Sequence, residues 1–129
     1  DKLSTIVISV ANDGMGLGWH FDTSASSVTM LLQAPEGGGV FEYVPEARDA
    51  DAGGMGFDNV ERVLDEGGPV CTLDFSPGDL VVFRGRNALH RDPTVVGSTT
   101  RSVVIFAFNE RPDASMSQAA LRTFFGRTA

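Results

Sequence analysis

The sequence predicts a mainly β protein, either a sandwich or a double-sheet jelly roll, with one or two short helices. About seven or eight short apolar runs, rich in valine, isoleucine and phenylalanine, recur at regular spacing. Glycine, proline and asparagine clusters lie between the runs, as expected for turns that join the strands of two packed sheets. Apolar residues fall at helical spacing in only two short stretches. No repeat or linker divides the chain, so we expect one domain over residues 1–129.

The first half of the chain consists of predicted strands and turns. Residues 5–11 are rich in β-branched side chains and end at Asn12-Asp13-Gly14, which predicts a strand followed by a turn. Residues 28–33 form a continuous apolar run, and we expect this strand to be buried on both faces. Residues 40–44 alternate between apolar and polar side chains and stop at Pro45, which predicts a half-buried strand.

The second half interrupts the strands with helices. Within the acidic, glycine-containing stretch 46–69, apolar residues from Phe57 to Leu64 lie at helical spacing, so we expect a helix near 57–65 as an insertion. The acidic side chains of this stretch are most simply a solvated face. The remaining predicted elements are strands over 70–75, 79–83 and 102–108, a type II-like turn at Pro77-Gly78, and a terminal helix over 114–125.

Composition narrows the possible partners and compartment. The formal net charge of −7 argues against nucleic acid or an anionic membrane surface as a partner, because both repel an acidic protein. The single cysteine, Cys71, excludes an internal disulfide, and its apolar neighbours predict a buried structural thiol. The sequence contains no signal-like segment and no run of 18 apolar residues. We therefore expect a cytoplasmic protein that acts on a small molecule.

The strongest chemical pattern is Gly18-Trp19-His20-Phe21-Asp22. In an extended segment His20 and Asp22 share one face, because strand side chains alternate. An imidazole and a carboxylate in one cavity are two members of the facial triad that binds non-haem Fe(II), and His90, the other histidine in the chain, could complete it. The alternative is that His20 is an ordinary strand histidine and that Asp22 only begins a turn. Trp19 and Phe21 point to the opposite face and are expected in the core.

Four ordered motifs resemble those of the Fe(II)/2-oxoglutarate-dependent oxygenases. They are His20-x-Asp22, Gly38-Gly39-x-Phe41, Pro77-Gly78-Asp79, and His90 followed by Arg101. The stretches GGGVFEYVPEAR, FSPGDLVVFRGRNALHR and FAFNERP are most similar to the branch that contains the free amino-acid hydroxylases and radical halogenases. The resemblance covers roughly residues 17–112 and implies a double-stranded β-helix of the cupin type. Proteins of this kind usually have helices before the His-x-Asp segment, which we expect this chain to lack.

The resemblance assigns roles to particular residues. It implies that His20, Asp22 and His90 bind Fe(II) and that Arg101 pairs with the distal carboxylate of 2-oxoglutarate, leaving positions on iron for the cosubstrate and O2. An arginine suits that role, because its guanidinium donates two parallel hydrogen bonds to a carboxylate. Arg101 opens a strand whose inward face it would share with Val103, Ile105 and Ala107.

Asp22 bears on the choice of reaction. The halogenases of this branch carry a small residue at the acid position, which leaves a site for chloride on iron. The carboxylate of Asp22 therefore implies hydroxylation of an aliphatic C–H bond, with release of succinate and CO2. The expected substrate is a free or carrier-bound amino acid. Two alternatives stay open, namely a non-catalytic metal-binding cupin that acts as a ligand-binding module, and a zinc or manganese isomerase.

Several side chains and properties have no firm assignment from the sequence. Arg84 and Arg86 flank the turn before His90, where they are either solvated surface or a contact to a substrate or cosubstrate carboxylate. Thr23 lies just beyond the acid and is within reach of a substrate. The glycines at 37–39 and Pro77-Gly78 are interpreted as turn residues without chemistry. The sequence does not indicate the oligomeric state.

Overall fold

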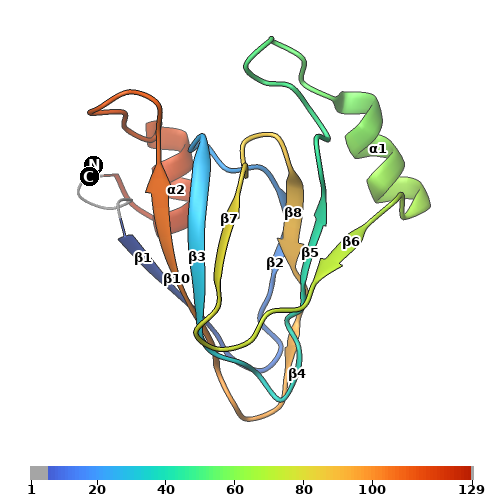
Figure 1. Ribbon diagram of the computed structural model, residues 1–129, viewed down its shortest axis with the longest axis vertical. Coiled ribbons are helices and arrows are strands. Elements are labelled where there is room, and N and C mark those ends of the chain that lie inside the picture. The colour runs from blue at the N-terminus through green and yellow to red at the C-terminus, as the bar shows by residue number, and fades with distance from the viewer. Residues whose placement is uncertain (1–5, 129) are drawn as a thin grey trace.

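The computed structural model describes residues 6–128, which form two facing antiparallel β-sheets and two short helices (Figure 1). The first sheet has the strand order β1-β10-β3-β7 and the second β2-β8-β5-β6, and β4 pairs with β9 in a two-stranded ribbon. The strands are β1 (Ile6–Ala11), β2 (Leu17–His20), β3 (Ser26–Gln33), β4 (Gly37–Gly38), β5 (Phe41–Val44), β6 (Cys71–Leu73), β7 (Leu80–Phe83), β8 (Leu89–Asp92), β9 (Val95–Val96) and β10 (Arg101–Phe108). The helices are α1 (Phe57–Glu66) and α2 (Gln118–Phe125).

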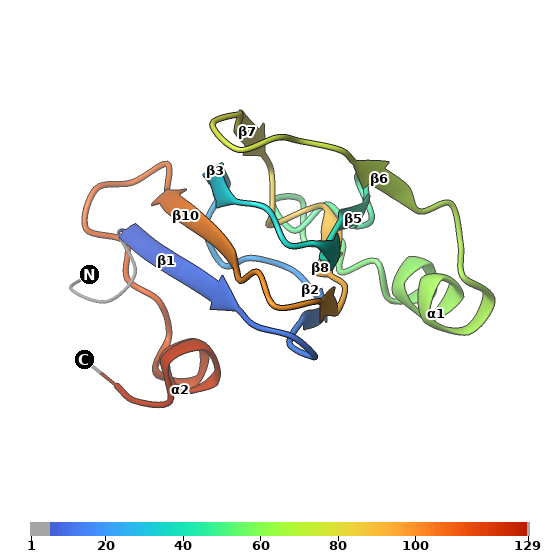
Figure 2. The ribbon, with the colours of Figure 1, turned by 90° about the horizontal axis from the view of Figure 1, so that it is seen from below.

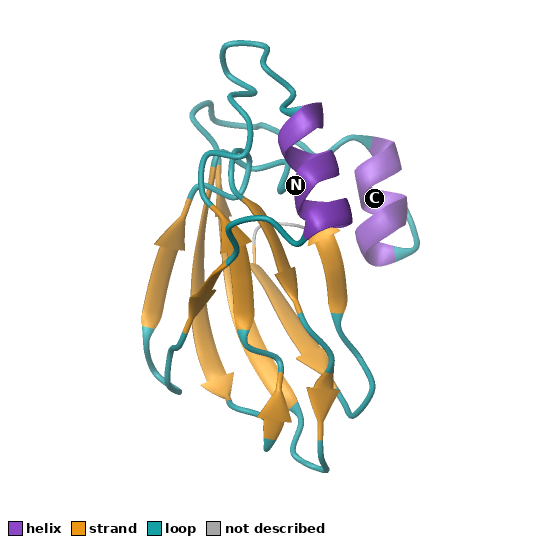
Figure 3. Cartoon of the chain, turned by 90° about the vertical axis from the view of Figure 1, so that its right-hand side faces the viewer, coloured by secondary structure: helices purple, strands orange, loops and turns teal. Residues whose placement is uncertain are grey.

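The predicted fold class is confirmed. Seen from below, the two sheets form two layers, with α2 beside β1 and α1 beside the second sheet (Figure 2). Neighbours in each sheet come from distant parts of the chain, as β1 and β3 both pair with β10, which is the pattern of a jelly roll and not of a simple meander. Both helices lie towards the same end of the molecule, to which the long loops also extend (Figure 3). Neither helix is long and apolar enough within residues 6–128 to cross a lipid bilayer.

The predicted elements are found with small shifts in their bounds. Strand β1 covers the described part of the 5–11 prediction, since Thr5 lies outside the described residues. Helix α2 begins at Gln118 and not at Ala114, because the Ser117 hydroxyl accepts a hydrogen bond from the backbone N–H of Ala120 and so caps the helix there. The turn at Pro77-Gly78 is also found, with Gly78 at a φ of 95° and the Asp79 N–H donating to the Ser76 carbonyl at 3.0 Å.

Helix α1, predicted from its spacing, packs against the second sheet. Val63 is buried with Val44, Ala47 and Leu89, and Val60 packs against this cluster. Phe57 and Leu64, which share the predicted apolar pattern, are exposed, because only part of the helix surface faces the sheet. Trp19 and Phe21 pack against the same cluster, as expected for side chains opposite His20. This hydrophobic cluster therefore packs against the face of β2 that is opposite His20.

Two predictions about burial were wrong. Strand β3 is not buried on both faces, because it lies inside a sheet whose outer side leaves side chains such as Leu32, Val82 and Ile8 exposed. Cys71 is exposed and not buried, because it begins β6, a three-residue strand at the edge of the second sheet. The sequence around Leu32 and around Cys71 is apolar, but the position of each side chain in its sheet decides its exposure.

Candidate metal centre

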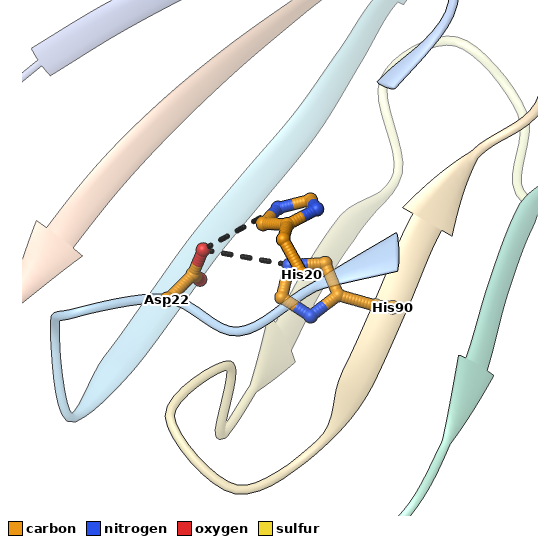
Figure 4. A group of neighbouring side chains, drawn as sticks. All are labelled: His20, Asp22 and His90. Atoms are coloured by element: carbon orange, nitrogen blue, oxygen red, sulfur yellow. Dashed lines mark ion pairs between the residues drawn. The ribbon is translucent and has the colours of Figure 1, made fainter. Parts of the chain in front are cut away.

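The antiparallel pairing of β2 and β8 places His20 directly opposite His90. Their ring centroids lie 4.2 Å apart, and Asp22, in the loop after β2, turns back towards both rings (Figure 4). Asp22 Oδ1 is 3.4 Å from His90 Nε2 and 3.8 Å from His20 Nε2. The predicted neighbourhood of His20, Asp22 and His90 is therefore found, with one ligand atom from each residue lying within 4.8 Å of the others.

Each histidine is oriented by the backbone carbonyl two residues before it. His20 Nδ1 lies 2.8 Å from the Gly18 carbonyl, and His90 Nδ1 lies 2.8 Å from the Ala88 carbonyl. A carbonyl oxygen only accepts, so Nδ1 carries the proton in both hydrogen bonds. In the neutral imidazole this leaves the lone pair on Nε2, the atom that faces Asp22. Such a backbone contact fixes the tautomer and ring orientation that a metal ligand needs.

Asp22 is held by contacts that the sequence pattern does not show. Its backbone N–H donates to the Gly85 carbonyl at 2.9 Å, and its Oδ2 accepts a hydrogen bond from the Ser27 hydroxyl at 2.8 Å. A Cβ atom at residue 85 would overlap the Asp22 carboxylate, so glycine provides the room that the carboxylate occupies. Oδ1 is thereby directed at the histidines while Oδ2 is held by Ser27.

The electrostatics of the three groups differ. Burial and the neighbouring His90 lower the pKa of His20. Burial also disfavours the charged form of His90, but the hydrogen bond and negative charge of Asp22 outweigh it and raise the pKa of His90 above its usual 6.5. Burial disfavours the Asp22 carboxylate, yet His90 and Ser27 lower the pKa of Asp22. Without a metal, Asp22 therefore favours the protonated form of His90, whereas burial and His90 favour the neutral form of His20.

This donor set fits a divalent metal ion. Two Nε2 atoms and one carboxylate oxygen converge from one side, which is the arrangement of the 2-His-1-carboxylate triad and leaves further coordination positions free. His90 is held in place by aromatic contacts, since the Phe83 and Phe41 rings lie 5.0 Å and 5.5 Å from it. The hydrogen bond between His20 and the Gly18 carbonyl agrees equally with the alternative, an ordinary hydrogen-bonded strand histidine.

Two members of the triad, His20 and Asp22, line a cavity of about 760 Å³ between the sheets. Arg101, at the start of β10, lines this cavity, as do Ile105 and Ala107 on the same face of the strand. The Arg101 side chain is buried, and its Nη2 donates to Asp92 Oδ1 at 2.8 Å. Helix α2 closes one side, with the Phe124 ring 6.2 Å from His20 in an edge-on arrangement.

The remaining candidates from the sequence separate into two groups. Thr23 and Arg86 line the cavity, whereas Arg84 does not, and its side chain is 70% exposed. Ser27 and Asp92 are functional candidates that were not predicted from the sequence. Asp92 follows His90 by two residues in β8, so strand alternation could have placed it on the same face. No local spacing signals Ser27, because it reaches Asp22 only through the packing of β3.

Comparison with known proteins identifies the family. The family model described as halogenase D matches residues 3–123, nearly the whole chain. The chain belongs to the halogenase D family. No curated protein matches it. Membership of the halogenase D family agrees with the predicted similarity to the branch that contains radical halogenases, and together with the His-Asp-His group it indicates a halogenase-like metal enzyme.

The metal affinity of this member of the halogenase D family is expected to fall in mild acid. Because the pKa of His90 lies above 6.5, a proton must leave His90 before a metal binds at pH values below that pKa. Because the pKa of His20 is lowered, its proton competes only at a more acidic pH than that of His90, so the affinity should fall about tenfold per pH unit where His90 alone is protonated. Calorimetric titration with Mn²⁺ from about pH 5.5 to 9 measures this slope. An affinity that stays constant down to the acid end contradicts it.

Proposed function

We propose that the protein is an Fe(II)/2-oxoglutarate-dependent dioxygenase that hydroxylates an aliphatic C–H bond of a small molecule, a free or carrier-bound amino acid. In the overall reaction one oxygen atom of O2 enters the substrate and the other enters succinate, while the keto acid loses CO2. In this proposal the protein binds a small molecule and does not bind nucleic acid or a membrane, in keeping with its net charge of −7.

The observation that carries this proposal is the position of the Asp22 carboxylate. Its Oδ1 faces the Nε2 atoms of both histidines, and Ser27 and Gly85 support it there. A carboxylate so held would occupy one coordination position of the metal together with His20 and His90. By the resemblance, radical halogenases leave that position to chloride. The supported ligand is thus an argument for hydroxylation within a family whose description names halogenation.

Arg101 is the proposed anchor for the cosubstrate. Its guanidinium is buried at the wall of the same cavity, where a carboxylate would be held in a poorly solvated place. Asp92 engages Nη2, and the other side-chain N–H donors of Arg101 have no hydrogen-bond partner within residues 6–128. These donors can bind the distal carboxylate of 2-oxoglutarate, and the fork geometry orients it.

The proposal gives each group of residues a separate role. His20, Asp22 and His90 would hold Fe(II), and bound iron supplies the redox chemistry that couples cleavage of 2-oxoglutarate by O2 to oxidation of the C–H bond. Gly18 and Ala88 fix the histidine rings, and α2 limits access of water to the cavity beside His20. The cavity volume suits a small substrate together with a keto acid.

Halogenation is the second candidate, because the family description favours it. It requires a chloride position on the metal, and Asp22 stands at the position where the resemblance places chloride. The two candidates differ in product, since hydroxylation adds an oxygen atom whatever the chloride concentration. Mass spectrometry of products formed with and without chloride therefore separates them.

The test of the proposed function is the visible charge-transfer band of a chelated keto acid. Fe(II) and then 2-oxoglutarate are added to metal-free protein without oxygen, and we expect the band to appear. After oxygen is admitted, succinate and CO2 should form in equal amounts. Absence of the band in folded, iron-loaded protein would instead favour the non-catalytic cupin or the isomerase.

A further inference from the structure

A second hollow adjoins the metal cavity and carries two arginines. The two hollows share Asp22, Thr23 and Arg86, and the second one adds Arg48 and the Phe21 ring beneath it. Asp22, the acidic member of the triad, borders both hollows, so the second hollow lies beside the metal site. The arginines come from different segments, Arg86 from the turn between β7 and β8 and Arg48 from the loop after β5.

Arg48 is positioned before any ligand arrives. Its guanidinium carbon lies 3.9 Å from the centroid of the Phe21 ring, and its Nε donates to the Arg86 carbonyl at 2.6 Å. Its two Nη groups have no hydrogen-bond or ion-pair partner within residues 6–128. The side chain is half-buried, so these donors are held still beside the hollow, and binding there would cost little side-chain entropy.

The cluster has an excess of positive charge. Asp51 is shared by Arg86, at 3.0 Å, and Arg84, at 3.3 Å, and Arg48 has no carboxylate partner in the described part of the chain. Arg86 also donates from Nη2 to the Thr23 carbonyl at 3.3 Å. Burial and the charge of Arg86 lower the pKa of Arg48. The guanidinium groups of Arg48, Arg84 and Arg86 thus gather near the carboxylates of Asp51 and Asp22, in a protein whose net charge is −7. An anion bound between Arg48 and Arg86 would relieve their repulsion.

We propose that Arg48 and Arg86 form an oxyanion subsite that binds a carboxylate of the substrate and so places its reactive carbon at the metal cavity. The inference rests on the proposed function and narrows its substrate class. A free amino acid has a carboxylate for this subsite, whereas a carrier-bound amino acid has lost it to the thioester. The substrate is therefore a free amino acid or another small carboxylic acid, and its carboxylate is bound apart from that of 2-oxoglutarate, for which Arg101 is proposed.

A purely structural role is the competing explanation. Arg48 and Arg86 also connect the loop after β5 to the turn before β8, through the Arg86 carbonyl and through Asp51. The test must therefore distinguish a lost anion site from a loosened loop. Arg84 is a matched control, because it pairs with the same Asp51 but lines neither hollow.

The first experiment titrates inorganic phosphate into metal-free protein and follows the heat of binding. Wild type should bind one phosphate, and Arg48→Gln and Arg86→Gln should each weaken binding at least about tenfold, because each removes charge-assisted hydrogen bonds. Arg84→Gln should stay within about twofold of wild type, since it removes charge outside the hollow. Arg48→Lys, which keeps the charge, should recover part of the lost affinity. Equal melting temperatures establish that the variants are folded.

The second experiment identifies the carboxylate. The twenty standard free amino acids and their α-carboxamides are used as competitors of phosphate, and we expect one or more of the acids to displace it while the matching amides do not. No phosphate binding by wild type, equal binding by Arg48→Gln and Arg86→Gln, or an equal loss in Arg84→Gln overturns the subsite. Phosphate that no free amino acid displaces, or that an amide displaces equally well, overturns its assignment to a substrate carboxylate. Because no metal is present, these results are independent of the charge-transfer band that tests the proposed function.

Discussion

Replacing Asp22 with glycine is expected to abolish hydroxylation, with a loss of more than about 100-fold in the rate of succinate-coupled product formation. The carboxylate is the one anionic ligand among the three residues of the candidate centre, and its Oδ1 faces both Nε2 atoms. Without it, Ser27 Oγ and the Gly85 backbone face an empty space beside the histidines. We expect added chloride to shift the charge-transfer band of this variant and to leave that of wild type unchanged.

Ser27→Ala is the matched control for this substitution. It keeps the carboxylate but removes the hydroxyl that holds Oδ2, so the loss of activity should be clearly smaller than in Asp22→Gly. Hydroxylation at the wild-type rate in Asp22→Gly would remove Asp22 from the mechanism and with it the argument against halogenation. A chlorinated product from wild type in the presence of chloride would contradict the proposed reaction directly.

Replacing Arg101 with alanine is expected to weaken 2-oxoglutarate binding by more than about 100-fold, because a carboxylate in the cavity would lose two charge-assisted hydrogen bonds. The Arg101 side chain is only 5% exposed, so solvent would replace these bonds poorly. Titration of 2-oxoglutarate into the anaerobic iron protein, followed by the charge-transfer band, measures the change. The band should still form at high 2-oxoglutarate concentration, because the metal ligands are intact.

Asp92 supplies the control for Arg101. Arg101→Ala leaves the half-buried Asp92 carboxylate without its partner, and part of any defect could come from that unpaired charge. In Asp92→Asn the guanidinium remains, and the affinity for 2-oxoglutarate should stay within about threefold of wild type. An equal loss in both variants would mean that the ion pair, and not a contact to the cosubstrate, explains the effect. Unchanged affinity in Arg101→Ala would place the distal carboxylate elsewhere.

Much of the fold could be predicted because its signals are local. The β-branched residues of β1, the alternation in β5, the apolar run of β10, the helical spacing in α1 and the turn at Gly78 each depend on a few neighbouring residues. The exposure of a side chain also depends on which elements lie next to its strand, and this could not be predicted from the local sequence. The exposure of Cys71 follows from its place in an edge strand, and that of Leu32 from an uncovered side of the first sheet.

In the candidate site, too, the local features could be predicted and the contacts between distant segments could not. The meeting of His20 and Asp22 could be predicted from their spacing, although β2 ends at His20 and Asp22 lies in the loop after it, and the approach of His90 could be proposed because the chain has one other histidine. The residues that support them, Ser27 and Gly85, come from other strands and turns and meet Asp22 only in the folded chain. Arg48 illustrates the limit most clearly, because its relation to Phe21 and Arg86 has no counterpart in sequence spacing.

The position of the three ligands also has a consequence for local unfolding. His20 and His90 are opposite one another in a strand pair with an irregular register, in which the paired residues are Leu17 with Asp92 and His20 with His90. A metal held by both strands and by the following loop would add its binding free energy to this short pairing, since only the closed pair presents all three ligands. Opening of β2 from β8 and release of the ion would then be a single cooperative event, so that slow amide exchange in these strands would report occupancy of the centre.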